Sequence, residues 1–138
     1  MCFSGKYTYK QMRDFMTKNG GMVDHLGTSD VLEVKERIQN GDQYAELIYN
    51  AMIYQIGKYI GAYAAVMNGD VDAILLTGGI AKDKNLVARV TDMVRFIAPV
   101  HVYAGEFEME ALSSGALRVL TGEEAPKVYT GIPVWSGF

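Results

Sequence analysis

Hydrophobic residues recur every three or four positions along much of this chain, which is the spacing of an amphipathic helix. The pattern predicts helices over residues 9–18, 31–39, 43–67, 84–94 and 110–120. Side chains able to cap a helix precede most of them, namely Thr8, Ser29 or Asp30, Asp42 and Asp83. Glycines interrupt the pattern at Gly20-Gly21, Gly41 and Gly122, where helices commonly end. Residues 21–28 lack the pattern and are predicted to be a loop.

The helix predicted over residues 43–67 is the longest element, and it would span roughly 37 Å at the usual rise per residue. We expect it to bury a stripe made of Leu47, Ala51, Met52, Ile56, Tyr59, Ile60 and Tyr63. Gly57 and Gly61 lie four residues apart on one face. Such glycines usually mark the close approach of another element.

Two apolar runs between the helices, residues 71–76 and 98–103, predict β-strands. Residues 73–76 are continuously apolar, which is typical of a parallel strand buried on both faces. The order of helices and strands predicts an α/β fold with parallel strands. Two strands leave both sheet edges unpaired and favour self-association. Either strands are missed in the first thirty residues, or the rest of the sheet lies on other polypeptide.

Composition narrows the classes of protein to be considered. The 138 residues fit one domain, and 49% hydrophobic with 21% charged residues is typical of a folded globular protein. The net charge is −3 and no basic run is present, which argues against nucleic-acid binding. The single cysteine, Cys2, permits no internal disulfide, and we expect it to be inert.

Neither a leader sequence nor a membrane span is predicted. Lys6 and Lys10 interrupt the apolar start of the chain. The most apolar stretch, residues 48–67, contains Asn50, Gln55 and Lys58, which a membrane-spanning helix rarely tolerates. We therefore expect a cytoplasmic protein.

The segment ILLTGGIA, residues 74–81, carries the clearest chemical signal. A buried strand ends in Gly78-Gly79 and a helix follows, so a ligand can approach the backbone closely. Ligands of open α/β sheets bind outside the carboxyl ends of the strands, where this turn lies. A tight turn without a ligand is the alternative, because the segment matches neither a dinucleotide fingerprint nor a P-loop.

Carboxylates alternate after the second strand, at Glu106, Glu108 and Glu110. One of them, with Glu110 favoured, could hold Mg²⁺ directly or through water. Acids at a helix start also complement the helix dipole, and this explains at least two of the three without a metal.

The loop before the second predicted helix offers further polar groups. Asp30 can cap that helix, bind a ribose hydroxyl, or do both, and capping alone is the simpler reading. His25 could act as a general acid or base, although nothing near it in sequence orients it. His101 lies within a predicted strand, where we expect a packing role.

These segments together resemble the butyrate kinases, within the acetate and sugar kinase/Hsc70/actin superfamily. The resemblance is collinear from residue 1 to about residue 129. It runs through CFSGKYT at 2–8, GGMVDHLGTSD at 20–30, VDAILLTGGIA at 71–81, FIAPV at 96–100 and GEFEMEALSSGALRVL at 105–120. It implies the C-terminal half of a ribonuclease H-like, actin-type ATPase fold, with a domain over residues 1–129, a tail over 130–138 and an incomplete sheet.

The resemblance also implies a reaction, in which butyrate or a short branched acid and ATP give the acyl phosphate and ADP. Gly78, Gly79, Ile80 and Thr77 would lie along the nucleotide, with Asp30 near its ribose or adenine end. Glu110 would match the acid that orients Mg²⁺ in the related acetate kinases. Leu32 stands where related kinases often carry Arg, and Ala104 stands where Pro is common.

The resemblance covers only part of such an enzyme. This chain contains no match to the family's first phosphate loop or to the Arg and His residues that handle the carboxylate, so no catalytic residue is assigned within it. The expected partners are a small carboxylate, the N-terminal half of the enzyme and other copies of the chain. A non-catalytic nucleotide-binding or assembly module derived from such a kinase is the alternative. The sequence fixes neither the acid nor the oligomeric state.

Overall fold

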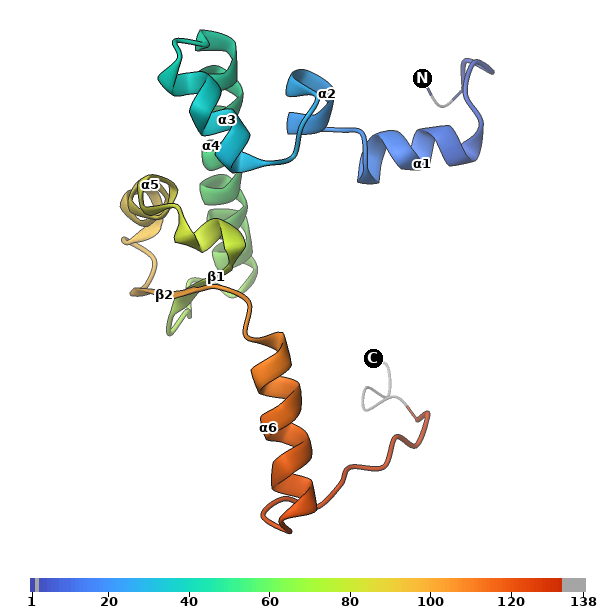
Figure 1. The fold of residues 1–138 in the computed structure, drawn as a ribbon, viewed down its shortest axis with the longest axis vertical. Coiled ribbons are helices and arrows are strands. Elements are labelled where there is room, and N and C mark those ends of the chain that lie inside the picture. The colour runs from blue at the N-terminus through green and yellow to red at the C-terminus, as the bar shows by residue number, and fades with distance from the viewer. Residues whose placement is uncertain (2, 133–138) are drawn as a thin grey trace. The chain divides into compact units, whose positions relative to one another are not determined.

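The computed structural model describes residues 1 and 3–132, and Cys2 and residues 133–138 of the predicted tail lie outside them (Figure 1). The chain divides into two compact units, Met1–Gly105 and Glu106–Phe138. The first unit contains α1 (Tyr9–Thr17), α2 (Met22–Leu26), α3 (Val31–Gln39), α4 (Gln43–Val66), β1 (Ile74–Gly78), η1 (Gly79–Lys82), α5 (Lys84–Val94) and β2 (Val100–Ala104). The second unit contains α6 (Glu108–Leu120).

The helix starts follow the predicted caps. The Thr8 hydroxyl and the Gln11 side chain form a reciprocal capping box at α1. Asp30, rather than Ser29, caps α3 by accepting a hydrogen bond from the Leu32 amide at 2.8 Å. Asp42 and Asp83 cap α4 and α5 in the same way. The predicted bounds of α3 and α5 are confirmed, and α6 begins two residues earlier than predicted, at Glu108.

The loop predicted over residues 21–28 is partly wrong, because α2 forms inside it. Gly21 and Gly27 lie at the two ends of this short helix with φ of 61° and 74°. These are left-handed conformations that side chains with a Cβ rarely adopt. The glycines that suggested a loop therefore serve to begin and end one helical turn.

The sheet consists of β1 and β2 in parallel, with Ile74 opposite Val100 and Gly78 opposite Ala104. Both strands lie about two residues further along the chain than predicted. β1 is buried on one face only, because Ile74 is 8% exposed and Leu75, on the opposite face, is 60% exposed. The described part of the first thirty residues contains α1 and α2 and no strand, so strands missed there do not explain the small sheet.

The core of the first unit forms where α4 meets α3, α5 and the sheet. The stripe predicted for α4 is partly wrong: Leu47, Ala51, Tyr59 and Tyr63 are exposed, whereas Met52, Ile56 and Ile60 are partly buried against the core. The residues that are buried instead are Ala45, Tyr49, Ile53, Gly57 and Ala64. Tyr49, Ile53 and Gly57 of this face lie directly beside the predicted stripe along the helix.

Gly57 confirms the expected close approach. A Cβ added at this position would lie 2.6 Å from Cε of Met93 on α5, which is a clash. A Cβ added at Gly61 meets no described atom within 4 Å. Only the first of the two glycines therefore lies against another element, and the atoms nearest to it belong to the flexible side chain of Met93.

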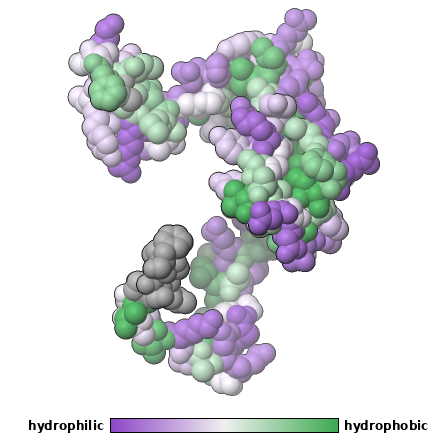
Figure 2. All heavy atoms as spheres, turned by 180° about the vertical axis from the view of Figure 1, so that it is seen from behind, coloured by the Kyte–Doolittle hydropathy of each residue, from purple (hydrophilic) through white to green (hydrophobic). Residues whose placement is uncertain are grey.

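The second unit is built around α6, which has no buried residue. Its helix ends before Gly122, at φ 75°, and Arg118 is paired with Glu124 at 2.9 Å. Exposed apolar side chains lie along α6, along α4 and on the strands. Figure 2 shows hydrophobic residues at the surface. No helix in the described part of the chain has the length and apolar character needed to cross a membrane.

Candidate functional site

The turn after β1 is shaped by two glycines. Gly78 ends the strand with φ 79° and ψ −176°, a conformation that favours glycine strongly. Gly79 then starts η1, a short 3₁₀ helix that the sequence did not predict. A Cβ added at Gly79 would meet no described atom within 4 Å. The backbone of the turn at this residue therefore faces open space into which a ligand can fit.

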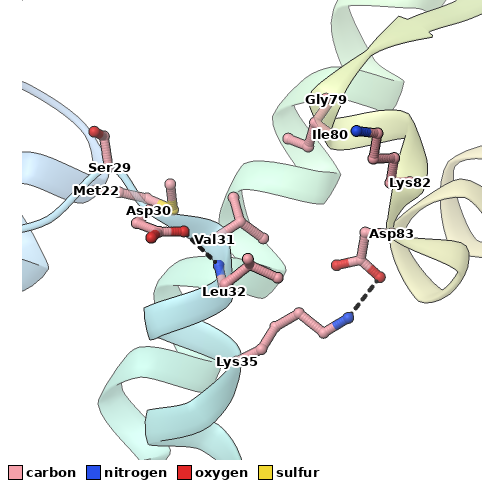
Figure 3. A pocket seen from close by; sticks show the side chains of 10 residues that line it. All are labelled: Met22, Ser29, Asp30, Val31, Leu32, Lys35, Gly79, Ile80, Lys82 and Asp83. Atoms are coloured by element: carbon pink, nitrogen blue, oxygen red, sulfur yellow. Dashed lines mark hydrogen bonds and ion pairs between the residues drawn. The ribbon is translucent and has the colours of Figure 1, made fainter. Parts of the chain in front are cut away.

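A cavity of about 470 Å³ lies beside this turn, within the first unit (Figure 3). One wall is formed by α2, the residues after it and the start of α3, and the other is formed by η1 and Asp83. The lining residues are Met22, Ser29, Asp30, Val31, Leu32, Lys35, Gly79, Ile80, Lys82 and Asp83. The volume is within the range of about 300–1,000 Å³ that is usual for small-molecule sites.

The two walls are joined by an ion pair. Nζ of Lys35, on α3, lies 2.9 Å from Oδ1 of Asp83 (Figure 3). The hydroxyl of Tyr49, on α4, donates to Oδ2 of Asp83 at 2.7 Å. Oδ1 of Asp83 also accepts from the amides of Asn85 and Leu86, at the start of α5. One carboxylate thus connects three helices at the edge of the cavity.

The protonation of this group follows from its surroundings. Burial acts to raise the pKa of Asp83, but the hydrogen bonds from Tyr49 and Lys35 outweigh it and hold the pKa below its usual value. Burial, together with the hydrogen bond to Asp83, raises the pKa of the Tyr49 hydroxyl. At neutral pH, Asp83 is therefore a carboxylate and Tyr49 is a neutral donor.

The predicted nucleotide-site residues are partly brought together. Asp30, Gly79 and Ile80 all line the cavity. Gly78 and Thr77 precede it on β1 and are not among the lining residues. Asp30 uses Oδ1 for the helix cap, and its Oδ2 makes no hydrogen bond to a described residue.

The predicted metal residue lies in the other unit. Glu110 is exposed in the first turn of α6, close to Glu108 in sequence. The described residues contain no group of three or more His, Cys, Asp or Glu side chains placed to hold a metal ion.

Sequence reasoning missed three charged residues of the cavity, Lys35, Lys82 and Asp83. A signal was present for Lys35, since it follows Val31 by four residues and therefore lies on the same face of α3. Leu32, which occupies the position where related kinases often have Arg, is 76% exposed at the cavity. The positive charge of this cavity comes instead from Lys35 and Lys82.

The two histidines differ from expectation. Nδ1 of His25 lies 2.8 Å from the hydroxyl of Tyr44, so a residue distant in sequence orients its ring. His101 was expected to be a packing residue, and this is wrong because it is exposed on β2. Neither lines the cavity beside Gly79.

A model of the acetokinase family matches residues 4–128 of the sequence. The chain belongs to the acetokinase family. It is 55% identical over 129 residues to probable butyrate kinase 2 of Caldanaerobacter subterraneus subsp. tengcongensis, a match that covers 94% of this chain and 36% of that protein. The chain thus spans about a third of the length of this curated family member.

The fold agrees with this assignment to the family. The structure matches the crystal structure of Porphyromonas gingivalis acetate kinase with a TM-score of 0.72 and 24% identity, over 84% of this chain and 35% of that one. The predicted α/β fold of the actin-type ATPases is therefore confirmed.

Proposed function

We propose that this chain is the nucleotide-binding part of an ATP-dependent carboxylate kinase that converts butyrate or a short branched acid to its acyl phosphate. The observation that carries the proposal is the cavity beside Gly79, in a chain of the acetokinase family. The cavity follows the carboxyl end of a parallel strand, which is where ligands of α/β sheets bind.

The cavity residues suit an adenine nucleotide. Met22, Leu32 and Ile80 offer apolar surface for a base, and the absence of a side chain at Gly79 lets a ligand approach the backbone. Oδ2 of Asp30 is available to accept a hydrogen bond from a ribose hydroxyl. Lys82 contributes positive charge to balance phosphates, whereas the charge of Lys35 is balanced by Asp83.

Glu110 is the proposed metal-facing residue of the chain. Mg²⁺ commonly binds through one or two carboxylates and the phosphates of the substrate, with waters completing its shell. One acidic side chain therefore fits this use without a preformed cluster. When bound, the metal would neutralise phosphate charge, and Glu110 would orient it.

We further propose that residues 1–129 form the C-terminal domain of the enzyme and residues 130–138 a tail. The groups that bind the carboxylate and neutralise the transferred phosphoryl group would then belong to an N-terminal half. Phosphoryl transfer depends on positioning and charge neutralisation, so this chain alone should turn over very little. A cytoplasmic homo-oligomer is proposed for the assembled enzyme.

Two measurements test the proposal. Calorimetry should detect weak binding of ADP to the chain, and binding should weaken in Gly79→Ala. Acyl hydroxamate formation from butyrate and ATP should be negligible for the chain and should appear when a separately expressed N-terminal half is added. Absence of ADP binding by the mixture would refute the nucleotide site.

The same experiment examines a second candidate, a non-catalytic module. The exposure of Leu75, Val102 and Tyr103 on a two-stranded sheet favours association with another protein surface. Nucleotide binding and assembly without acyl phosphate formation, even in the mixture, would support this candidate over the kinase.

A further inference from the structure

We propose that Asp83 is a positioning residue, which fixes the separation of the two walls of the cavity through Lys35 and Tyr49. The inference rests on the proposed nucleotide site. It adds that ligand affinity depends on a hydrogen-bond cluster that includes a residue outside the cavity lining, Tyr49. We refer to Lys35, Tyr49 and Asp83 as the clamp.

The carboxylate of Asp83 connects three elements of the first unit. Lys35 belongs to α3, Tyr49 to α4, and Asp83 to the junction of η1 and α5. The partners are 48 and 34 residues from Asp83 in sequence. The contacts therefore hold together elements that form the two sides of the cavity, in addition to starting α5.

The hydrogen bond between Tyr49 and Asp83 is buried. Asp83 is 9% exposed and Tyr49 is 5% exposed, so water competes poorly for their hydrogen bond. A buried carboxylate is costly unless it is paired and hydrogen-bonded, and here both oxygens have partners. Rotation of Asp83 away from Tyr49 would leave the buried Tyr49 hydroxyl unsatisfied. The arrangement is therefore held in one geometry.

The clamp lies close in sequence to Gly79 and Ile80, which line the cavity. These residues lie four and three positions before Asp83, in the short η1 segment. The Asp83 amide also donates to the Ile80 carbonyl at 3.0 Å. Movement of Asp83 would therefore move the wall that Gly79 and Ile80 form against Asp30 and Leu32. A preorganised site binds its ligand more tightly because less ordering is needed on binding.

The experiment compares ADP affinity across four variants of the full chain by calorimetry with Mg²⁺ present. Tyr49→Phe removes only a hydroxyl that does not line the cavity, and it should weaken binding about fivefold. Asp83→Asn should weaken binding about tenfold or more. Lys35→Met should resemble Asp83→Asn, whereas Lys35→Arg should retain affinity within about threefold because it keeps the ion pair.

Asp42→Asn is the matched control. Asp42 also caps a helix and pairs with a basic residue of α3, Arg37, but it does not line the cavity. ADP affinity should stay within about twofold of wild type, the spread expected where no binding contact changes. All affinities are compared at a temperature at which circular dichroism shows each variant folded.

Hydrogen–deuterium exchange gives a readout that needs no ligand. In Tyr49→Phe and Asp83→Asn, amides of α3 and of the η1–α5 junction should exchange faster together, whereas Asp42→Asn should affect the start of α4. If wild type binds ADP and Tyr49→Phe binds it equally, the clamp is refuted. If wild type does not bind ADP, the proposed nucleotide site is refuted, and the clamp is then tested by hydrogen–deuterium exchange alone. Unchanged exchange of the amides in both walls of the cavity would refute the clamp.

Discussion

Two turns of the first unit each contain a glycine with a positive φ and an aspartate that caps the next helix, but the two aspartates differ in their surroundings. The turn from α3 to α4 has Gly41 at φ 89° followed by the capping residue Asp42, and Asp42 pairs with Arg37. The turn from β1 to α5 has Gly78 at φ 79° and ends in the capping residue Asp83. Asp83 pairs with Lys35, which also belongs to α3.

The difference between the turns lies in what surrounds each carboxylate. Asp42 is partly exposed, and its ion pair joins neighbouring helices over five residues of sequence. Asp83 is buried and borders the cavity. In addition to its ion pair and its helix cap, it accepts a hydrogen bond from the Tyr49 hydroxyl. The same local cap can thus serve only the helix start, or it can also fix the shape of a site.

The largest expected difference is in stability. Asp83→Ala leaves the Tyr49 hydroxyl and the Lys35 ammonium without their partner and removes a cap, so we expect a loss of about 3 kcal/mol in the free energy of unfolding. Asp42→Ala should cost less, because solvent can replace its contacts. Urea denaturation of both variants measures this. Equal losses would mean that the burial of Asp83 has no energetic consequence.

Substitutions at the two glycines of the turn after β1 should have different effects, one on ADP affinity and the other on stability. Gly79→Ala adds a methyl group to open space, so stability should change by less than about 0.5 kcal/mol while ADP affinity falls about tenfold. Gly78→Ala should instead lose about 1 kcal/mol of stability, because its φ is positive. Calorimetry and thermal unfolding of both variants distinguish these effects. Normal ADP binding by Gly79→Ala would place the nucleotide elsewhere.

A third effect is the dependence of stability on pH. Because the folded-state pKa of Asp83 is lowered, its contribution is present above about 3.8 and is lost as the pH falls through the folded pKa. The raised pKa of Tyr49 has the opposite sense, so its contribution is lost as the pH rises above about 10. Tyr49→Phe should flatten the alkaline limb of a plot of unfolding free energy against pH. An unchanged alkaline limb would contradict a strong Tyr49–Asp83 interaction.

The smallest effect concerns the charge of the α3 wall. Leu32→Arg adds a cation to an exposed position at the cavity, so ADP affinity should rise about threefold at low salt with little change in stability. Adenosine, which lacks phosphates, serves as the control ligand and should bind as to wild type. An equal gain for both ligands would point to packing rather than to charge.

Local signals explain the parts of the fold that the sequence predicted well. Asp30 and Asp83 are each followed by a helical pattern, and α3 and α5 start and end where predicted because a cap acts within one turn. The buried face of α4 was predicted only in part, since apolar residues surround that helix and periodicity alone could not choose a face. Met52, Ile56 and Ile60 do pack against the core, but the fully buried positions beside them depend on contacts with α3 and α5.

The sequence predicted some residues of the candidate site and missed others. Gly79, Ile80 and Asp30 were predicted from a strand–glycine–helix pattern and a family resemblance, and the structure brings all three to one cavity. Their roles toward a nucleotide, and that of Glu110 toward a metal, stay predictions. Lys82 was missed because it looks like an ordinary surface lysine in the sequence. Lys35 was missed although its spacing from Val31 places it on the same face of α3.

The sequence by itself determined the order of the longer helices and the two strands, the start of each capped helix and the family to which the chain is similar. Those features depend on residues within a few positions of one another or on an ordered set of short segments. Only the tertiary structure decided that Lys35, Tyr49 and Asp83 meet. Their contacts cross 34 and 48 residues of chain, and they form because the packing of three helices places the buried carboxylate of Asp83 within reach of both partners.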